Sequence, residues 1–446
     1  MTQLLGRRSF LISSTALAAT AMLTRPAFGI TPGKDRLRLG LVGCGGRGIG
    51  AACDALLADP DVELVAIADL FPETLETYAA KLVEQFTSPW RGELMQESQA
   101  LELVAKRAQV PPNRRFAGWE AYRELCALPE VDIVLLAAPP VFRPLHLEAA
   151  LAHGKHVFME KPVCVDPVGG RKLMELATIA DEKKLCVVAG TQRRHQAEYV
   201  EGIQRIHDGQ IGDILSAQCY WLMEGYVGSN LRHPEIAPEQ MEYQVRNWFC
   251  FVWASGDHIV EQHVHNIDVI NWALQGRAPE SCTALGGRGV DLPMPAYGNR
   301  YSHFAADFDY GNNLHVASYC RQEPMTSGKV TERIIGTKGV IEFKGMQTEI
   351  TGERPWRFSG ESPNPYVQEH VNLIRAVRSG NHINETRSVT SSTMLAVLAR
   401  ESAYTGRALR HDWLWKTSKL NLTPDTWGWG VKPIDPLPVP GVYSIT

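Results

Sequence analysis

The chain has 446 residues, of which 44% are hydrophobic and 21% are charged, and its formal net charge is −4 at pH 7. This length and apolar content suit two domains, each with its own core. A mildly acidic chain without a basic run argues against a nucleic-acid partner. Beyond the first residues, no stretch approaches the ~18 uninterrupted apolar residues of a membrane span, so we expect none in the mature protein.

The first 29 residues have the pattern of an export signal. Arg7-Arg8 precedes an apolar run over residues 11–23, and Ala27-Phe28-Gly29 offers a cleavage site, as in signals of the twin-arginine pathway. Removing residues 1–29 would remove three arginines and no acid, and would take the formal charge from −4 to −7. We therefore expect a protein exported through this pathway, to the periplasm or an equivalent location.

The nine cysteines are scattered and include no C-x-x-C pair. An exported protein would ordinarily suggest disulfides. The twin-arginine pathway, however, implies that the chain folds before export in a reducing compartment, so we expect mostly free, buried thiols.

Residues 37–69 have the pattern of a dinucleotide-binding unit. An apolar strand enters Gly43-Cys44-Gly45-Gly46-Arg47-Gly48, a helix-compatible segment follows, and a second apolar strand ends at Asp69. We assign the tight turn to Gly43, close backbone approach to a pyrophosphate to Gly45, and close helix-on-strand packing to Gly48. The phosphates would lie at the helix N-terminus. The unit predicts a Rossmann domain, which we place over residues 36–162.

The acid at the end of the second strand indicates which dinucleotide binds. Asp69 stands 21 positions after Gly48, where a carboxylate accepts from both adenosine ribose hydroxyls and repels a 2′-phosphate. Leu70 and Phe71 offer no basic replacement, so NAD is favoured. Arg47 keeps NADP open, because a guanidinium in the glycine turn could reach an adenosine phosphate.

The α/β rhythm continues after Asp69. The apolar run 131–138 predicts a parallel strand covered on both faces, and it ends in Pro139-Pro140, beneath which a nicotinamide could lie. A further strand runs into Glu160-Lys161-Pro162. The other elements expected here are helices over 72–83, 119–128 and 144–153, a strand over 156–159, and an irregular charged insertion over 87–115.

The ordered set of a G-x-G-x-R-G turn, Asp69, a Pro-Pro strand exit and Glu160-Lys161-Pro162 resembles the Gfo/Idh/MocA family of oxidoreductases. The resemblance covers residues 36–410 and implies that Lys161 lies beside the nicotinamide and the substrate hydroxyl, with Glu160 at the cofactor. A strand-end lysine is ordinarily a solvated charge. Lys161, however, closes a strand at the carboxyl edge, where such sheets bind ligands. Pro162 is a candidate for a cis peptide bond.

Residues 163–410 are expected to form an α+β domain with a large, mostly antiparallel open sheet. Strands at 214–224 and within 281–344, many of them alternating, predict one helix-covered face. The other face needs a partner, so we expect a homo-oligomer, a dimer or a tetramer. Helices are expected over 167–183, 365–379 and 388–405, and a strand over 185–190.

A polar segment follows the strand over 185–190. Its side chains either face solvent, with Thr191 capping the next helix, or form a sugar-contacting rim at the carboxyl end of the strand. We take them as candidate substrate-binding residues. They are Gln192, Arg193, Arg194, His195 and Tyr199.

The densest polar chemistry lies in residues 257–272. On a helix, Glu261, His265 and Asp268 share one face. Helices of this kind in the family carry Asp-x-x-x-His-x-x-Asp, which implies that His265 accepts the substrate's hydroxyl proton, as suits an imidazole of pKa about 6.5. Asp268 joins the substrate-binding candidates. The alternative for His265 is an ordinary core histidine.

Glu261 stands where the family usually has an aspartate. Its longer side chain could reach the substrate, orient His265, or simply favour the helix N-terminus. A metal site is not expected from this segment, because His263 and His265 point to different helix faces.

The Trp/Pro-rich tail, residues 411–446, is expected to be an ordered wrap, because Trp427 and Trp429 are costly to leave in water.

The working hypothesis is an NAD(P)-dependent oxidoreductase that acts on a CH–OH group of a sugar, glycoside or cyclitol. The cofactor would carry the hydride, while His265 and Lys161 manage the proton. One alternative is an NAD-dependent glycosidase that works by transient oxidation and elimination. The other is a dinucleotide-binding protein without catalysis, which the presence of both Lys161 and His265 disfavours. An exported enzyme cannot rely on free NAD, so tight cofactor retention is expected.

Overall fold

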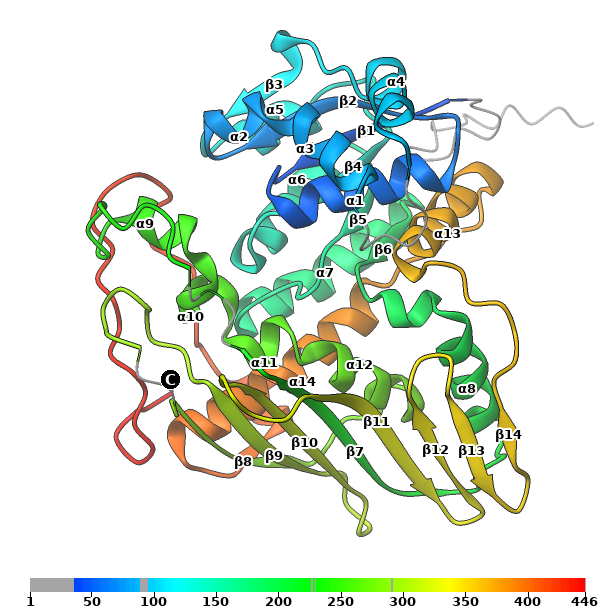
Figure 1. Cartoon of the computed structure of the whole chain (residues 1–446). Helices are drawn as coiled ribbons and strands as arrows, with labels where there is room; N and C mark the ends of the chain where they lie inside the picture. Colours follow the sequence, from blue (N-terminus) through cyan, green and yellow to red (C-terminus); the bar gives the residue numbers. More distant parts are fainter. Residues whose placement is uncertain (1–35, 89–94, 226–227, 229, 290–291, 446) are drawn as a thin grey trace, which may run out of the picture.

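The computed structural model describes residues 36–88, 95–225, 228, 230–289 and 292–445. The expected export signal therefore lies outside the described residues. Two sheets form the framework, with helices packed between them (Figure 1). Within the described ranges, every helix is too short or too polar to span a bilayer.

The first sheet has six parallel strands in the order β3-β2-β1-β4-β5-β6. Because the strands are parallel, their carboxyl ends meet at one edge, and the order reverses between β1 and β4, where such sheets bind dinucleotides. The strands are β1 (Leu37–Val42), β2 (Val62–Asp69), β3 (Arg115–Ala117), β4 (Ile133–Leu136), β5 (His156–Met159) and β6 (Val187–Ala189). Strands β4 and β5 are buried along their whole length, as expected for central strands.

Helices cover both faces of this sheet, which is the expected Rossmann arrangement (Figure 1). They are α1 (Gly46–Ala58), α2 (Pro72–Glu76), α3 (Tyr78–Phe86), α4 (Glu97–Arg107), α5 (Ala121–Cys126), α6 (Arg143–Ala152), α7 (Pro167–Lys183) and, from much later in the chain, α13 (Pro365–Ser379).

Two local expectations differ from the structure. The helix expected over 72–83 is divided at Thr77, whose Oγ1 lies 3.3 Å from the carbonyl oxygens of both Glu73 and Thr74 and competes with the helical ladder. The insertion expected to be irregular contains α4, which starts with a reciprocal cap between Gln96 and Gln99.

The boundary expected after residue 162 also falls too early. Helix α7 carries the chain back across the sheet, and β6 then pairs in parallel with β5. A strand, crossover helix and parallel strand form one unit, so the first sheet ends at β6.

The second sheet has nine strands in the order β14-β13-β12-β11-β7-β10-β9-β8-β15. All pairs are antiparallel except β7 with β10, which confirms the expected large, mostly antiparallel sheet. The strands are β7 (Ile214–Met223), β8 (Ser281–Gly287), β9 (His303–Asp309), β10 (His315–Gln322), β11 (Lys329–Gly336), β12 (Gly339–Phe343), β13 (Glu349–Gly352), β14 (Trp356–Arg357) and β15 (Leu409–Arg410).

Helices pack on one face of this sheet and separate it from the Rossmann domain (Figure 1). They are α8 (Ala197–His207), α11 (His258–Glu261), α12 (Val264–Ala273) and α14 (Thr386–Thr405). The opposite face carries a row of residues paired across four strands, Leu285, Ala305, Tyr319 and Tyr220. Leu285 is 73% exposed, so this row is uncovered in the single chain, while Asp307 and His315 form an ion pair on the same face.

Helices α9 (Met241–Arg246) and α10 (Val252–Ser255) form a side module that reaches the Rossmann domain (Figure 1). The tail begins at α15 (His411–Lys416) and runs beside this module. It is tied along its length: Arg171 donates to the carbonyl oxygens of Trp415 and Ser418, and the Tyr301 hydroxyl donates to that of Pro438. All nine cysteines are buried thiols outside any disulfide, as expected.

Candidate active site

The glycine turn between β1 and α1 forms an open cradle. Gly43 has φ +94°, and a Cβ there would stand 2.5 Å from the Ala138 nitrogen. A Cβ on Gly48 would stand 1.8 Å from the Gly43 oxygen, so Gly48 permits the close packing of helix on strand. Gly45 and Gly46 face open space at the N-terminus of α1. The turn therefore has the shape and the free N–H groups that a pyrophosphate needs.

Asp69 is tied directly to this turn. Its Oδ2 accepts from the Cys44 N–H at 2.7 Å and its Oδ1 from the Phe71 N–H at 3.0 Å. Burial raises the pKa of Asp69, and the two N–H groups limit that rise. The carboxylate is thus held at the end of β2, where the adenosine ribose is bound in dinucleotide folds.

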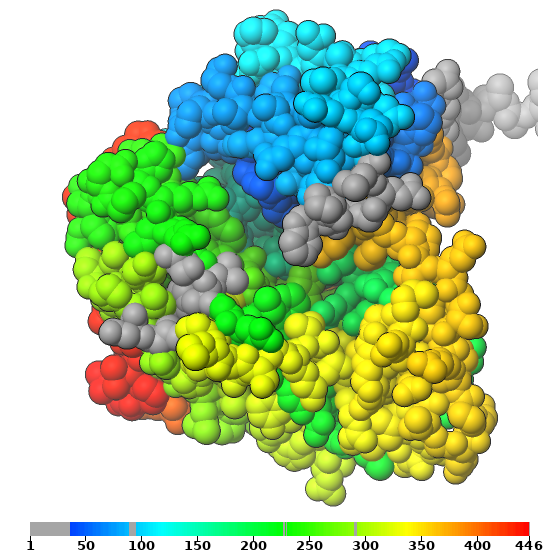
Figure 2. Space-filling model, viewed as in Figure 1, coloured from blue at the N-terminus to red at the C-terminus, as the bar shows by residue number. Residues whose placement is uncertain are grey.

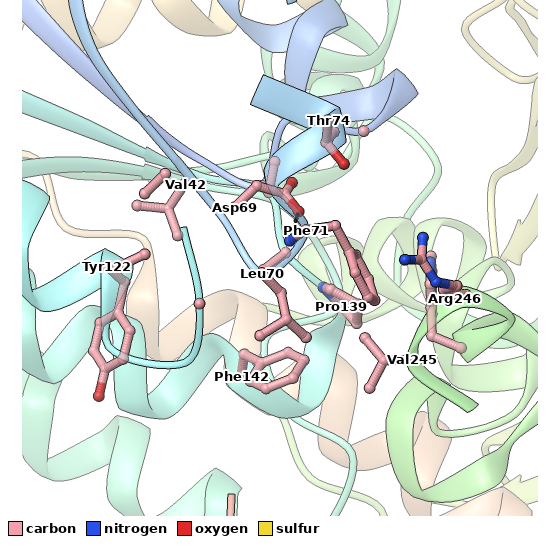
Figure 3. A pocket seen from close by; sticks show the side chains of 18 of the residues that line it. Val42, Asp69, Leu70, Phe71, Thr74, Tyr122, Pro139, Phe142, Val245 and Arg246 are labelled. Atoms are coloured by element: carbon pink, nitrogen blue, oxygen red, sulfur yellow. Dashed lines mark hydrogen bonds between the residues drawn. The ribbon is translucent and has the colours of Figure 1, made fainter. Parts of the chain in front are cut away.

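A cavity of about 750 Å³ lies along this edge of the sheet (Figure 3). Its size is that of a ligand site. Five of the expected cofactor residues line it: Gly43, Gly45, Gly46, Asp69 and Pro139. Figure 3 shows that Val245 and Arg246 of the side module face Phe71 and Phe142 across it, so both domains contribute walls.

Arg47 points away from this cavity. Its Nε donates to Glu160 Oε1 at 2.5 Å, its Nη2 lies 3.3 Å from Asp54 and 3.8 Å from Glu369, and the guanidinium stacks on Tyr366. With three carboxylates around it, Arg47 is engaged in ion pairs rather than directed at an adenosine 2′-phosphate. This arrangement removes the sequence argument that kept NADP open.

Lys161 lies two residues after the end of β5 and contacts α11 of the second domain. Its Nζ donates to the Glu261 carbonyl oxygen at 2.5 Å and lies 3.2 Å from Glu261 Oε1. The other carboxylate oxygen of Glu261 is buried and has no hydrogen-bond partner among the described residues. The peptide bond between Lys161 and Pro162 is cis, as expected.

His265 lies on α12 beside this pair. Its ring stacks on Trp221 with centroids 5.8 Å apart, and its Nδ1 has no hydrogen-bond partner among the described residues. Burial lowers the pKa of His265 well below its ordinary value, and the positive charges of Lys161 and Arg193 lower it further. The imidazole is therefore neutral at pH 7 and can accept a proton. Lys161, Glu261 and His265 lie close together, but Glu261 ends α11 and His265 lies on α12, so they do not share the single helix that the sequence predicted.

Arg193 and Tyr199, two of the expected rim residues, converge on Glu332 of β11. Arg193 forms a buried ion pair with Glu332, and the Tyr199 hydroxyl donates to Glu332 Oε2 at 3.1 Å. The guanidinium of Arg193 also lies 5.9 Å from the Trp221 ring centroid, next to His265. These contacts hold Arg193 beside the proposed proton acceptor, and its contact with a substrate stays a prediction.

Arg194 and Asp268 pair with each other. Arg194 donates twice to the carboxylate, at 2.8 and 2.9 Å, and Ser392 donates to Asp268 Oδ1 at 2.6 Å. Asp268 is 1% exposed. The pair joins η4 (Gln192–His195) to α12, and it accounts for both residues without a substrate.

Gln192 and His195 lie next to α13. Gln192 donates to the Tyr366 hydroxyl at 3.3 Å, and its own Oε1 is buried without a partner among the described residues. His195 Nδ1 accepts from Asn372 at 2.8 Å. Gln192 thus keeps an unused acceptor near the Arg47 cluster, whereas His195 is held by a neighbouring helix.

Sequence reasoning missed a second polar group around His265. Gln262 Oε1 accepts from Trp221 Nε1 at 3.2 Å and also from Gln322 Nε2. Trp221 and Gln322 come from β7 and β10, far from α12 in sequence, so no local pattern could have indicated the group. Among the described residues, no three His, Cys, Asp or Glu side chains are grouped to hold a metal ion.

Comparisons with known proteins identify the family of the chain. The profile of the Gfo/Idh/MocA oxidoreductases, described as an oxidoreductase family with an NAD-binding Rossmann fold, matches residues 37–191. The inositol 2-dehydrogenase of Rhodococcus jostii is 35% identical over 305 residues, which are 65% of this chain and 78% of that protein. The chain belongs to the Gfo/Idh/MocA family. Its NAD-binding segment contains the glycine cradle, Asp69 and Lys161.

Other family relatives align over less of their length, 39% and 32% for two of them. The second is a glycosyl hydrolase family 109 protein of Streptomyces niveus, 28% identical over 191 residues, or 41% of this chain. The aldose-aldose oxidoreductase of Caulobacter crescentus superposes with a TM-score of 0.62 at 15% identity, covering 84% of this chain and 99% of that one. This likeness shows the fold of a Gfo/Idh/MocA protein.

NAD fits the residues that the family assigns to it. The open space beside Gly45 and Gly46 would hold the pyrophosphate, and Asp69 would accept from the ribose hydroxyls. Lys161 follows β5, on the far side of β1 from Asp69 in the sheet order, which is the side where the nicotinamide would lie.

Proposed function

We propose that this chain is an NAD-dependent oxidoreductase that transfers a hydride between the nicotinamide and a hydroxyl-bearing carbon of a sugar, glycoside or cyclitol. The observation that carries the proposal is the grouping of Lys161 with Glu261 and His265 at the nicotinamide end of the Rossmann edge. Bound NAD supplies the hydride acceptor. The protein's part is to orient the hydroxyl and to remove its proton.

His265 is the proton acceptor in this proposal. Its ring is buried and neutral at pH 7, and one ring nitrogen has no partner among the described residues. Lys161 is fixed by the Glu261 carbonyl oxygen, which leaves its remaining donors for the substrate oxygen. Glu261 positions Lys161, a role that was not among the three left open by the sequence.

The substrate class follows from the relatives. The most extensively aligned relative described above is named an inositol 2-dehydrogenase, and the structural neighbour is named an aldose-aldose oxidoreductase. Both names describe polyhydroxylated rings or chains. A screen of free sugars and cyclitols, with nicotinamide absorbance as the signal, tests the proposal, and the absence of any reduced cofactor with the whole panel would contradict it.

The second candidate is a glycosidase that oxidises a sugar transiently, eliminates the glycosidic substituent and returns the hydride. The similarity to a glycosyl hydrolase family 109 protein favours it. Paired incubations separate the two functions: a free sugar that produces net reduced cofactor marks the dehydrogenase. Release of sugar from a glycoside without net cofactor change marks the glycosidase.

We further propose that Arg7-Arg8 directs export through the twin-arginine pathway and that the exported enzyme retains its NAD tightly. Folding before export would allow the dinucleotide to be loaded in the cytoplasm. Purifying the exported form, denaturing it and measuring the released dinucleotide tests the idea. Recovery far below one per chain, with activity only after NAD is added, would refute tight retention.

We also propose that the uncovered face of the second sheet pairs with another copy of the chain. The stacked rings of Tyr220 and Tyr319, with centroids 5.3 Å apart, and the exposed Leu285 form an apolar row on this face. Replacing Leu285 with Glu should reduce the mass measured by light scattering. An unchanged mass would place the interface elsewhere.

A further inference from the structure

The adenosine end of the NAD cavity is lined by one leucine and several aromatic side chains. Asp69 marks the ribose, and the walls beyond it are Leu70 and Phe71 after β2, Trp119 after β3, and Phe142 after β4. The cavity at this end therefore offers flat apolar surfaces, which suit a purine base (Figure 3).

One more wall comes from the C-terminal tail. Trp427 lines the cavity, and its ring lies 4.7 Å from Phe142 and 5.9 Å from Trp119 between centroids. Trp429 lies 4.9 Å from Trp119 and 5.7 Å from Phe71. The tail thus reaches the Rossmann domain and packs on the same aromatic residues that surround the base position.

The tail is anchored on both sides of these two tryptophans. Before them, the Leu422 N–H donates to Asp166 at 2.8 Å. After them, the Gly430 oxygen accepts from the Met241 N–H at 2.8 Å, and the Lys432 oxygen accepts from Gln244 Nε2 at 2.7 Å. Residues 422–432, called the strap below, therefore cross the adenine end between two fixed points.

The module that holds the strap is itself fixed to the Rossmann domain. Arg246 of α9 stacks on Phe71, 3.8 Å from its ring centroid, and pairs with Glu73 at 2.7 Å. Figure 2 shows the hollow between the blue Rossmann domain and the green module. The strap and the module together stand between the adenine end and solvent.

We propose that Trp427 is a wall of the adenine subsite and that the strap must detach before the dinucleotide leaves. Trp427 stacks with the base, and Trp429 holds Trp119 and Phe71 in place. The site is thus completed by the last part of the chain, which follows both sheets in sequence. The strap gives this protein a structural means of slow cofactor release.

The test measures binding without any substrate, so its outcome is independent of the proposed reaction. Trp427→Ala, Trp427→Phe and the control Trp356→Ala are compared after removal of bound dinucleotide. Trp356 lies on β14, at the edge of the second sheet, so its replacement removes the same ring far from the cavity. Titration calorimetry gives the affinities for NAD, ADP-ribose and nicotinamide mononucleotide, and stopped-flow displacement gives the release rate of NADH.

Trp427→Ala should lower the affinities for NAD and ADP-ribose by roughly 10- to 100-fold, the range for loss of one stacking partner of a base. It should also speed the release of NADH. Nicotinamide mononucleotide should bind as in the wild type, because it lacks the base. Trp427→Phe should recover most of the lost affinity for NAD and ADP-ribose, and Trp356→Ala should bind both as the wild type does. Unchanged ADP-ribose affinity in Trp427→Ala would overturn the adenine wall.

A second variant tests the strap without altering the cavity wall. Gln244 donates to the Lys432 oxygen and accepts from Trp253 Nε1 at 2.7 Å, so Gln244→Leu keeps the volume and loosens the anchor. NADH should then associate and dissociate faster, while its equilibrium affinity changes less than its rates. Release at the wild-type rate in a folded Gln244→Leu protein would overturn the strap.

Discussion

Lys161 Nζ donates to the main-chain oxygen of Glu261 at 2.5 Å, closer than its 3.2 Å separation from the carboxylate of the same residue. The contact joins the end of β5 to α11, and hence the Rossmann domain to the second domain. A backbone acceptor cannot be removed by substituting the side chain. The direction of Lys161 is therefore set mainly by the position of α11.

This geometry predicts unequal effects for the two residues. Lys161→Ala should lower kcat by ~10²-fold or more, the scale of a lost proton-transfer group, and leave NAD affinity nearly unchanged. Glu261→Gln keeps the carbonyl acceptor, so its kcat should fall less than about tenfold on the same scale. Steady-state kinetics and NAD titration check both. A Glu261→Gln loss as large as that of Lys161→Ala would assign the carboxylate a direct part in proton transfer.

The buried position of His265 predicts how the rate of oxidation depends on pH. Burial and the nearby Lys161 lower the pKa of His265, so the ring stays neutral and able to accept a proton as the pH falls through its ordinary value. Sugar or cyclitol oxidation should therefore keep its rate at about pH 6.5, the ordinary value for an imidazole, and lose it only at a lower pH, where the ring becomes protonated. His265→Asn should lower kcat by ~10²-fold and remove this acid limb. If the pH–rate profile of His265→Asn kept the same acid limb, a group other than His265 would be responsible for that limb.

The part of the site that the sequence predicted is local. The turn from Gly43 to Gly48 and the acid at Asp69 lie within one strand-helix-strand unit, so their spacing fixes their geometry. The pairing of Arg194 with Asp268 joins residues 74 positions apart. Both residues were expected to contact substrate, because each pattern was typical of a ligand-facing position and neither indicated its partner.

Asp69 predicts the cofactor preference. Asp69→Ala removes the acceptor of the ribose hydroxyls and also frees the Cys44 and Phe71 N–H groups, so NAD affinity should fall at least about tenfold. The affinity for NADP should fall less than the affinity for NAD, because the repulsion between Asp69 and the 2′-phosphate disappears. Asp69→Asn keeps one oxygen acceptor without the charge, so its NAD affinity should lie between those of the wild type and Asp69→Ala. Titration with both dinucleotides checks the ratio, and tighter NADP than NAD binding by the wild type would contradict the assignment.

Glu369 predicts how stability depends on pH. This residue of α13 is fully buried, and neither carboxylate oxygen has a hydrogen-bond partner among the described residues. Burial raises the pKa of Glu369 well above its ordinary value, and the neighbouring Glu160 raises it further, although Arg47 opposes the rise. The folded state therefore binds this proton more tightly than the unfolded chain does.

The sign follows from that difference. The protonated carboxyl contributes its full stability below the unfolded pKa, and the contribution is lost as the pH rises through the higher folded pKa. Glu369→Gln has no proton to lose, so its free energy of unfolding at pH 8 should exceed that of the wild type by about 1 kcal/mol or more, the scale of a poorly paired buried polar group. Its unfolding temperature at pH 8 should be correspondingly higher. At pH 5 the difference should shrink.

Thermal unfolding at pH 5, 6.5 and 8 measures this effect. Glu175→Gln, on the exposed face of α7, is the matched control and should follow the wild type at every pH. A Glu369→Gln protein less stable than the wild type at pH 8 would mean that Arg47, 3.8 Å away, holds Glu369 ionised in the folded protein. The guanidinium would then need all three surrounding carboxylates, and the Glu160 beside Lys161 would be fixed by the whole cluster.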